Sequence, residues 1–179
     1  MHTVDTMHET ELACSAFGQG FSCTMIQEIN AMCSVINGGY YYQPHLVTKV
    51  KDASGATVKT ISPLLQKQTI SSSISADIRS YMQASVEQGT SMTSKVQGYS
   101  SGGKTGTAEK FPRGNGKYVV SFIGYAPADN PRIAIYVVVD RPNSDKQDDA
   151  KYATRIVKSV LTDCLLYTSD AADDLTRVD

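Results

Sequence analysis

The sequence predicts an α+β fold, an antiparallel sheet flanked by helices. The two strongest strand patterns, residues 118–125 and 132–140, are separated by a tight turn at residues 129–131, which is typical of an antiparallel pair. Segments with helical spacing of apolar residues stand before and after these strands instead of alternating with them, as they would in a parallel sheet. The length of 179 residues suffices for one domain.

The first predicted helix begins at Thr24 and ends at residues 37–39. Thr24 followed three residues later by Gln27 fits a capping box, in which each side chain binds the other residue's backbone N–H. Asn-Gly-Gly at residues 37–39 is a typical stop, because glycine adopts the left-handed conformation at little cost. The apolar residues at helical spacing are Met25, Ile29, Met32 and Ile36. Such a stripe indicates a core-facing helix and not a cofactor site.

A hairpin and a second helix are expected next. Residues 40–51 are extended in pattern, residues 52–55 form a turn, and residues 57–61 return, which predicts a hairpin. The second helix is expected to begin near Ser75 and to end at Gly89. The apolar residues on one face of it are Ile74, Ile78, Tyr81, Met82 and Val86.

Three strands and a helix complete the predicted fold. A short strand is expected over residues 100–109, followed by a loop at residues 111–117 and the two strong strands. In residues 132–140 nearly every position is apolar, so both faces of that strand should be covered. A last helix should start within residues 145–149, where aspartates suit the N-terminal dipole. Its buried face is predicted to hold Ala153, Ile156, Val157, Val160 and Leu161.

Composition excludes several classes of function. A net charge of −1 offers no electrostatic footprint for nucleic acid. There is no run of eighteen apolar residues and no signal-like pattern at Met1. Outside the last sixteen residues the cysteines are odd in number, and no C-x-x-C pair occurs, so no disulfide framework is indicated. The three histidines have no metal-ligand spacing, and neither a metal nor a cofactor is expected.

Residues 164–179 have a different character from the rest. From Cys164 onward they resemble a translated sequencing-library adapter followed by a barcode and a primer site. We therefore expect residues 1–163 to form the domain and residues 164–179 to be a non-native tail. An adapter also predicts that the gene was read from a short piece, so that the N-terminus is cut as well.

A glycine-rich stretch around Lys104 is the candidate for chemistry. Glycine lets backbone N–H groups approach a ligand, and residues 101–108 combine three glycines with a lysine and two threonines. Residues 98–105 also satisfy the P-loop pattern of nucleotide binders. A P-loop needs a buried strand before it and a helix after it, whereas Gly106 and Pro112 follow here, so that hypothesis is disfavoured. A glycine-rich turn with a solvated lysine remains a third interpretation.

Several motifs in register resemble one family. They are Phe-Gly-Gln-Gly at 17–20 with Thr24 and Gln27, Asn-Gly-Gly at 37–39 with Pro-His-Leu-Val at 44–47, Gly-Gly-Lys-Thr-Gly-Thr-Ala at 102–108, and Ser-Phe-Ile-Gly-Tyr-Ala-Pro at 121–127. From residue ~11 to residue ~163 the chain resembles the C-terminal part of a class B penicillin-binding protein transpeptidase domain of the spore-cortex or division type. The resemblance implies a truncated form of the serine β-lactamase-like fold.

The resemblance implies acyl transfer from the D-Ala-D-Ala end of a peptidoglycan stem peptide through a serine acyl-enzyme, which β-lactams trap. Lys104 would supply positive potential and join the proton relay, and the hydroxyls of Thr105 and Thr107 would bind the substrate carboxylate. The backbone N–H of Thr107 would form half of the oxyanion hole, and Gly106 would leave the strand bare for substrate. The parent would face the outside of the cytoplasmic membrane through an anchor, with a membrane glycosyltransferase as partner.

The chain departs from the family at the nucleophile. The family places S-x-x-K and S-x-N before K-T-G, at distances that fall before Met1, and no S-x-N occurs in this sequence. The sole Ser-x-x-Lys, Ser101 to Lys104, has two glycines where a helix would be needed. We therefore expect an inactive fragment whose apolar strand 132–140 lacks a neighbour on one side. A β-lactamase, a D,D-carboxypeptidase or a β-lactam sensor would share K-T-G and stays open as an alternative.

Overall fold

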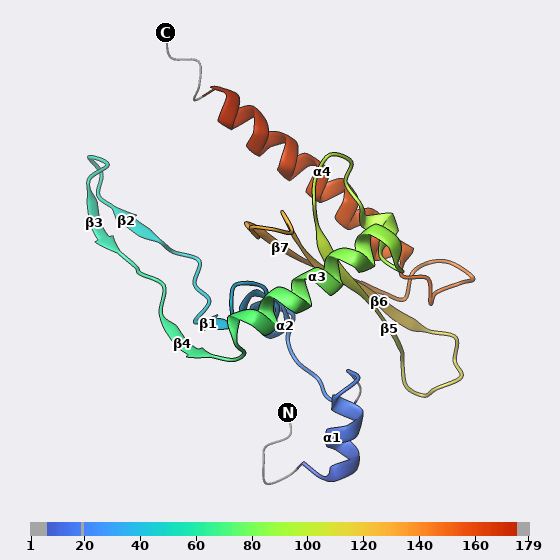
Figure 1. Ribbon diagram of the computed structural model, residues 1–179. Helices are drawn as coiled ribbons and strands as arrows, with labels where there is room; N and C mark the ends of the chain where they lie inside the picture. Colours follow the sequence, from blue (N-terminus) through green and yellow to red (C-terminus); the bar gives the residue numbers. More distant parts are fainter. Residues whose placement is uncertain (1–6, 19, 175–179) are drawn as a thin grey trace.

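The computed structural model describes residues 7–18 and 20–174, with side chains described as far as Leu165. Its helices are α1 (Glu9–Ser15), α2 (Met25–Ile36), α3 (Ser72–Gln88), the short 3-10 helix η1 (Met92–Ser94) and α4 (Lys151–Asp174). Its strands are β1 (Tyr40–Tyr42), β2 (Lys49–Lys51), β3 (Thr57–Thr60), β4 (Leu65–Gln68), β5 (Gly102–Glu109), β6 (Tyr118–Ala126) and β7 (Ile133–Asp140). All strand pairs are antiparallel and helices flank the central sheet (Figure 1), so the predicted α+β class is confirmed.

The central sheet has the order β5-β6-β7. Gly102 pairs with Tyr125 and Glu109 pairs with Tyr118, without a bulge between them. The β6–β7 turn is closed by Arg132, whose N–H donates to the carbonyl of Ala126 at 3.0 Å. These three strands lie within two residues of their predicted bounds, because alternation and turn residues identify them locally.

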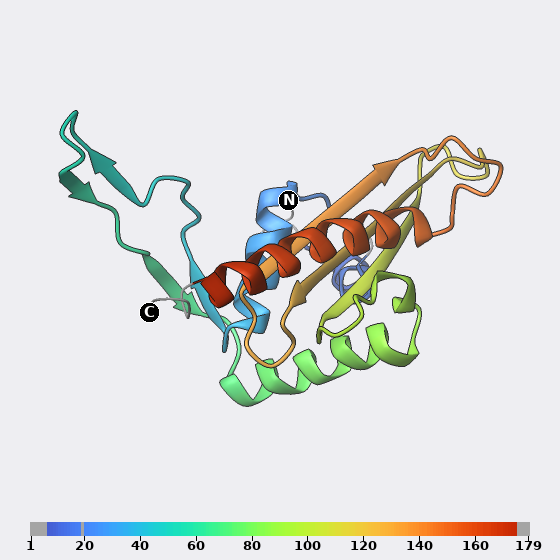
Figure 2. The same ribbon diagram turned by 90° about the horizontal axis from the view of Figure 1, so that it is seen from above.

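Helices cover the two faces of the sheet unequally. Helix α4 lies across one face (Figure 2) and packs with the sheet and α3 in a large cluster. That cluster contains Val86, Val96, Phe122, Ala126, Ala153, Val157, Leu161 and Leu165. The other face holds a smaller cluster with α2, formed by Met32, Ile36, Tyr125 and Ala128. The core is therefore richer on the side of α4.

Strand β7 has a free edge. Within the part of the chain that the structure describes, β7 pairs with β6 alone, as expected for residues 132–140. Every residue from Ile133 through Val139 is half-buried and none is buried. Both faces of this strand are thus covered only in part, which is less than its apolar sequence predicts.

The signals at the two ends of α2 act as predicted. The N–H of Thr24 donates to Gln27 Oε1 at 2.9 Å, and the N–H of Gln27 donates to Thr24 Oγ1 at 3.3 Å, which completes the capping box. Gly39 has a φ of +96°, and a Cβ there would lie 1.9 Å from the carbonyl oxygen of Ile70. Glycine is therefore required at Gly39 for both conformation and space.

The hairpin prediction is confirmed in part. β2 pairs with β3, but β1 pairs with β4 across a long insertion, which the sequence did not reveal. The β2–β3 ribbon extends away from the body of the molecule in both views (Figures 1 and 2). The predicted start of α3 is three residues late, because Ser71 caps the helix by accepting from the N–H of Ile74.

Helix α4 begins after the aspartates that were expected to open it. Asp149 lies just before the first helical residue, Lys151, and its Oδ1 accepts from the N–H of Lys151 at 2.9 Å. The helix continues through Asp174, and Leu165 is buried in the larger cluster. A foreign origin for residues 164–179 stays a prediction, because residues of any origin can continue a helix. Across the described residues, no helix has the length and apolarity needed to cross a membrane.

Candidate active site

The four predicted site residues lie together on β5, an outer strand of the central sheet. Among the described residues no strand pairs with the side of β5 that faces away from β6. Lys104 and Thr107 are exposed, and Thr105 and Gly106 are half-buried. The segment is therefore an accessible strand edge and not a loop.

The hydrogen-bond pattern of β5 determines which backbone groups point outward. Lys110 donates its N–H to the carbonyl of Lys117 at 2.8 Å, on the same register as β5 and β6. In an antiparallel ladder, bonded and non-bonded pairs alternate. Lys104, Gly106 and Ala108 consequently bond to β6, whereas the N–H and C=O groups of Thr105 and Thr107 point to the open side.

The side chains alternate across this edge in the same way. Lys104 and Gly106 share one face, and Thr105 and Thr107 share the other. Lys104 Nζ donates to the outward carbonyl of Thr105 at 2.8 Å. An ammonium, two hydroxyls and two free N–H groups thus border one line along the strand. Such a set can bind a carboxylate and stabilise an oxyanion.

The glycines of this segment are required by packing. A Cβ at Gly102 would lie 2.5 Å from the ring of Tyr125, and a Cβ at Gly103 would lie 2.1 Å from Phe122. Both glycines are buried, so their role is close packing against β6 and not presentation of N–H groups to a ligand. A Cβ at Gly106 would lie 2.6 Å from Ser121 Oγ. Of the glycine-rich stretch, Lys104 through Thr107 is therefore accessible and Gly102 and Gly103 are not.

Thr90 is a neighbour of the site that the sequence did not reveal. Its Oγ1 lies 3.4 Å from Thr105 Oγ1. The loop that carries Thr90 is held in place by Ser91, whose N–H donates to the carbonyl of Ser85 at 3.1 Å and whose Oγ lies 3.0 Å from Ser85 Oγ. Ser91 is fully buried. Nothing local in the sequence marks this contact, because fifteen residues separate the two threonines.

The nucleotide-binding hypothesis is wrong. Residues 102–109 form a strand, and Lys104 is followed directly by more of that strand and not by the helix that a P-loop requires. Ser101 is 5% exposed and directly precedes the strand, so it does not have the helix-start position of an S-x-x-K serine. The expectation that Ser101 is not a nucleophile is consistent with this placement.

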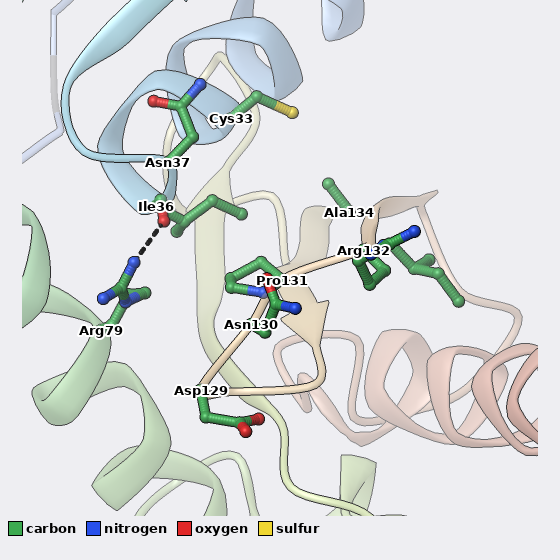
Figure 3. A pocket seen from close by; sticks show the side chains of 10 residues that line it. Cys33, Ile36, Asn37, Arg79, Asp129, Asn130, Pro131, Arg132 and Ala134 are labelled. Carbon is green, nitrogen blue, oxygen red and sulfur yellow. Dashed lines mark hydrogen bonds between the residues drawn. The ribbon is translucent and has the colours of Figure 1, made fainter.

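A separate cavity of about 360 Å³ lies at the β6–β7 turn (Figure 3). It is lined by Cys33, Ile36, Asn37, Arg79, Asp129, Asn130, Pro131, Arg132, Ile133 and Ala134, and no residue of 104–107 is among them. Arg79 Nη1 donates to the carbonyl of Ile36 at 2.8 Å, and Arg79 accepts from Tyr125 Oη through its own carbonyl. Burial raises the pKa of Tyr125 to about 12, although the nearby charge of Arg79 opposes the shift. Within the described residues, no group of three His, Cys, Asp or Glu side chains could hold a metal ion.

The sequence and the fold are similar to those of known proteins. The family model described as penicillin binding protein transpeptidase domain matches residues 5–162. Stage V sporulation protein D of Bacillus subtilis is 41% identical over 87% of this chain and 25% of its own length. Penicillin-binding protein PbpB of Mycobacterium tuberculosis is 30% identical over 79% of this chain and 23% of its own length.

Solved structures show the same fold. The transpeptidase domain of Burkholderia pseudomallei penicillin-binding protein 3 superposes with a TM-score of 0.77 at 28% identity, covering 94% of this chain and 49% of that one. Penicillin binding protein 3 of Mycobacterium tuberculosis, complexed with aztreonam, gives a TM-score of 0.78 at 24% identity, covering 95% of this chain and 40% of that one. The chain spans about a quarter of the length of the curated relatives named above.

Proposed function

The chain belongs to the penicillin-binding protein transpeptidase family, and from that premise we propose that it forms the K-T-G wall of a peptidoglycan D,D-transpeptidase active site. One observation carries the proposal. The N–H of Thr107 points to the open side of β5, on the same strand edge as Lys104 and Thr105. A D-Ala-D-Ala terminus lying along this edge would meet donors for its carbonyl oxygen and for its carboxylate.

In the proposed reaction a serine from the preceding part of the parent attacks the penultimate D-Ala carbonyl. Its Oγ adds to the carbonyl carbon, and the oxyanion takes a hydrogen bond from the N–H of Thr107. The C–N bond to the terminal D-Ala breaks, and its amine leaves with the proton lost by the serine, which passes near the ammonium of Lys104. An amine of a neighbouring stem peptide then attacks the acyl-enzyme carbonyl, the ester C–O bond breaks, and the amine's proton returns to the serine oxygen, which completes the cross-link. The hydroxyls of Thr105 and Thr107 hold the substrate carboxylate.

The transpeptidase is favoured over a β-lactamase, carboxypeptidase or sensor by the identity with stage V sporulation protein D, which extends over most of the chain. We extend the proposal, on the family resemblance alone, to an extracytoplasmic site on a membrane-anchored parent with a membrane glycosyltransferase as partner. β-Lactams would be ligands of the parent. Penicillin binding protein 3 of Mycobacterium tuberculosis, which has the same fold, has been solved in complex with aztreonam.

The test is a chimera in which residues 11–163 replace the matching segment of the Bacillus subtilis relative. Fluorescent penicillin should acylate the chimera. Thr107→Pro should reduce the acylation rate by about 10²–10³, because it removes one oxyanion donor. The N–H of Thr107 is outside the β5–β6 ladder, so proline is compatible with the fold there. Thr107→Ala keeps the N–H and should reduce the rate much less.

Two controls separate catalysis from folding. Ala108→Pro removes an N–H that bonds to β6 and should lower the unfolding midpoint of the chimera. Thr107→Pro should leave that midpoint near the value of the unsubstituted chimera. The 179-residue chain by itself should stay unlabelled. Equal rates for Thr107→Pro and Thr107→Ala would contradict the oxyanion role, and labelling of the chain at Ser101 would contradict the need for an outside nucleophile.

A further inference from the structure

The ribbon between β1 and β4, residues 44–64, is a second accessible feature of the molecule, and we call it the basic arm. Figures 1 and 2 show it extending from the body, with the N–H of Gln43 donating to the carbonyl of Leu64 at its base. Apart from half-buried Ile61, every residue of the arm is exposed. It carries three lysines against one aspartate, although the whole chain has a net charge of −1. The arm is therefore a positive projection on a net negative body.

The arm also exposes aliphatic side chains, which indicates that something covers it. A two-stranded ribbon is at best marginally stable alone in water. The exposed aliphatic residues on the arm are Leu46, Val47, Val50, Val58 and Leu64. Lysines alone would be explained as protection of an edge against aggregation. A lysine-protected edge with a fully exposed Leu46 is instead the composition of a docking surface with apolar and charged parts.

On the edge of β2 that faces away from β3, the free backbone groups belong to lysines. Thr48 accepts from the N–H of Ile61 at 2.9 Å, and the N–H of Asp52 donates to Ala56 at 3.0 Å. The register shifts between Val50 and Lys51, but Thr48 and Asp52 are bonded to β3 on either side of the shift, so the alternation continues along β2 and Val50 also faces β3. The N–H and C=O groups of Lys49 and Lys51 consequently point outward, where no other strand pairs with them among the described residues.

The side chains along this edge specify what can pair with it. Lys49 and Lys51 lie on one face of β2 and Val50 lies on the other. The Asp52 carboxylate is held within the turn, where it accepts from Ser54 N at 2.9 Å, Ser54 Oγ at 2.6 Å and Ala56 N at 3.0 Å. A strand that pairs with β2 would therefore be favoured if it carried an acidic, an apolar and an acidic residue in succession, opposite Lys49, Val50 and Lys51. We propose that β2 docks an extended acidic segment of another protein as an added strand.

A labelled peptide of about six alternating Glu and Val residues tests the proposal by fluorescence anisotropy with the full chain. The peptide should bind, and Lys49→Glu with Lys51→Glu should weaken it about tenfold. The matched control reverses two exposed lysines elsewhere, Lys95→Glu with Lys158→Glu, and should leave binding unchanged. Hydrogen exchange at the amides of Lys49 and Lys51 should slow on binding, since both would become ladder donors.

Three results would overturn the proposal. Equal binding of a peptide with its glutamates and valines in separate blocks would show that charge alone is recognised. Unchanged exchange at the amides of Lys49 and Lys51 would exclude an added strand. Binding to phosphatidylglycerol vesicles, with no binding to the alternating peptide, would assign the arm to a lipid surface. The same measurements on the Bacillus subtilis relative carrying residues 44–64 of this chain make the result independent of folding of the body.

Discussion

Substitution of Gly106 by alanine tests why a glycine stands in the middle of the K-T-G segment. A Cβ at Gly106 would lie 2.6 Å from Ser121 Oγ, whereas ordinary van der Waals contact begins at 3.4 Å. The next nearest atom, Ser121 Cβ, is 3.9 Å away, so the conflict is with the hydroxyl alone. That hydroxyl is also hydrogen-bonded to Tyr136. Moving it away would break this bond.

The expected cost follows from these contacts. Rotating the Ser121 hydroxyl loses a hydrogen bond of about 1 kcal/mol, and moving the backbone instead costs about 1–3 kcal/mol. Without a clash, alanine in a strand should be more favourable than glycine by about 0.5–1 kcal/mol. We therefore expect Gly106→Ala to destabilise the chain by about 1–2 kcal/mol. In a Ser121→Ala background the same change should be neutral or stabilising.

The assay is a double-mutant cycle from urea unfolding of the four variants, followed by fluorescence or circular dichroism. The coupling energy between Gly106 and Ser121 should be about 1–2 kcal/mol. If Gly106→Ala costs the same in both backgrounds, within about 0.5 kcal/mol, the hydroxyl is not the obstacle and the packing explanation fails. In the chimera, Gly106→Ala combined with Ser121→Ala should fold without the clash. The rate at which fluorescent penicillin acylates it then shows whether the site also needs a residue without a side chain at position 106.

Three further predictions concern the core and two titratable groups. Leu161→Ala should lower the free energy of unfolding by about 2–5 kcal/mol in urea titrations, whereas Val160→Ala, 41% exposed, should change it by about 0.5 kcal/mol or less. Since burial raises the pKa of Tyr125 to about 12, stability should fall as pH rises from about 10 toward 12, and Tyr125→Phe should flatten that fall in thermal melts. The hydrogen bond from Lys110 lowers the pKa of Asp140, so its contribution should be present above pH 3.8 and lost below it, and Asp140→Asn should remove that part of the acid sensitivity.

The elements that the sequence predicted correctly are those whose signals are local. Helix α2 carries its own start in Thr24 and Gln27 and its own stop in Gly39. Strands β6 and β7 combine alternation with a short turn, so their pairing needs no distant information. Lys104 and Thr107 lie on one edge because they are close in sequence and belong to the same strand, β5; their roles in a site stay a prediction.

The features that the sequence missed depend on contacts between distant segments. Strands β1 and β4 are three and four residues long and pair across residues 43–64, so neither has a period that reveals its partner. Thr90 reaches the site only because buried Ser91 holds its loop against α3. Local propensity contains neither contact.

The two outer strands of the sheet have different chemistry on their free edges, and under the proposed function this difference constrains how a parent protein would complete the site. The open side of β5 presents lysine, threonine and glycine, whereas β7 presents a run of isoleucine and valine with no neighbour among the described residues. An apolar free edge promotes aggregation, so a stable parent must cover β7 with further polypeptide. Because β6 lies between the two edges, polypeptide added at β7 leaves β5 open. The face that carries Lys104 continues into half-buried Ile123 and Tyr136, which α2 covers incompletely. A segment of the parent that packed on this face would bury those side chains and bring a serine beside Lys104 without blocking the outward N–H of Thr107.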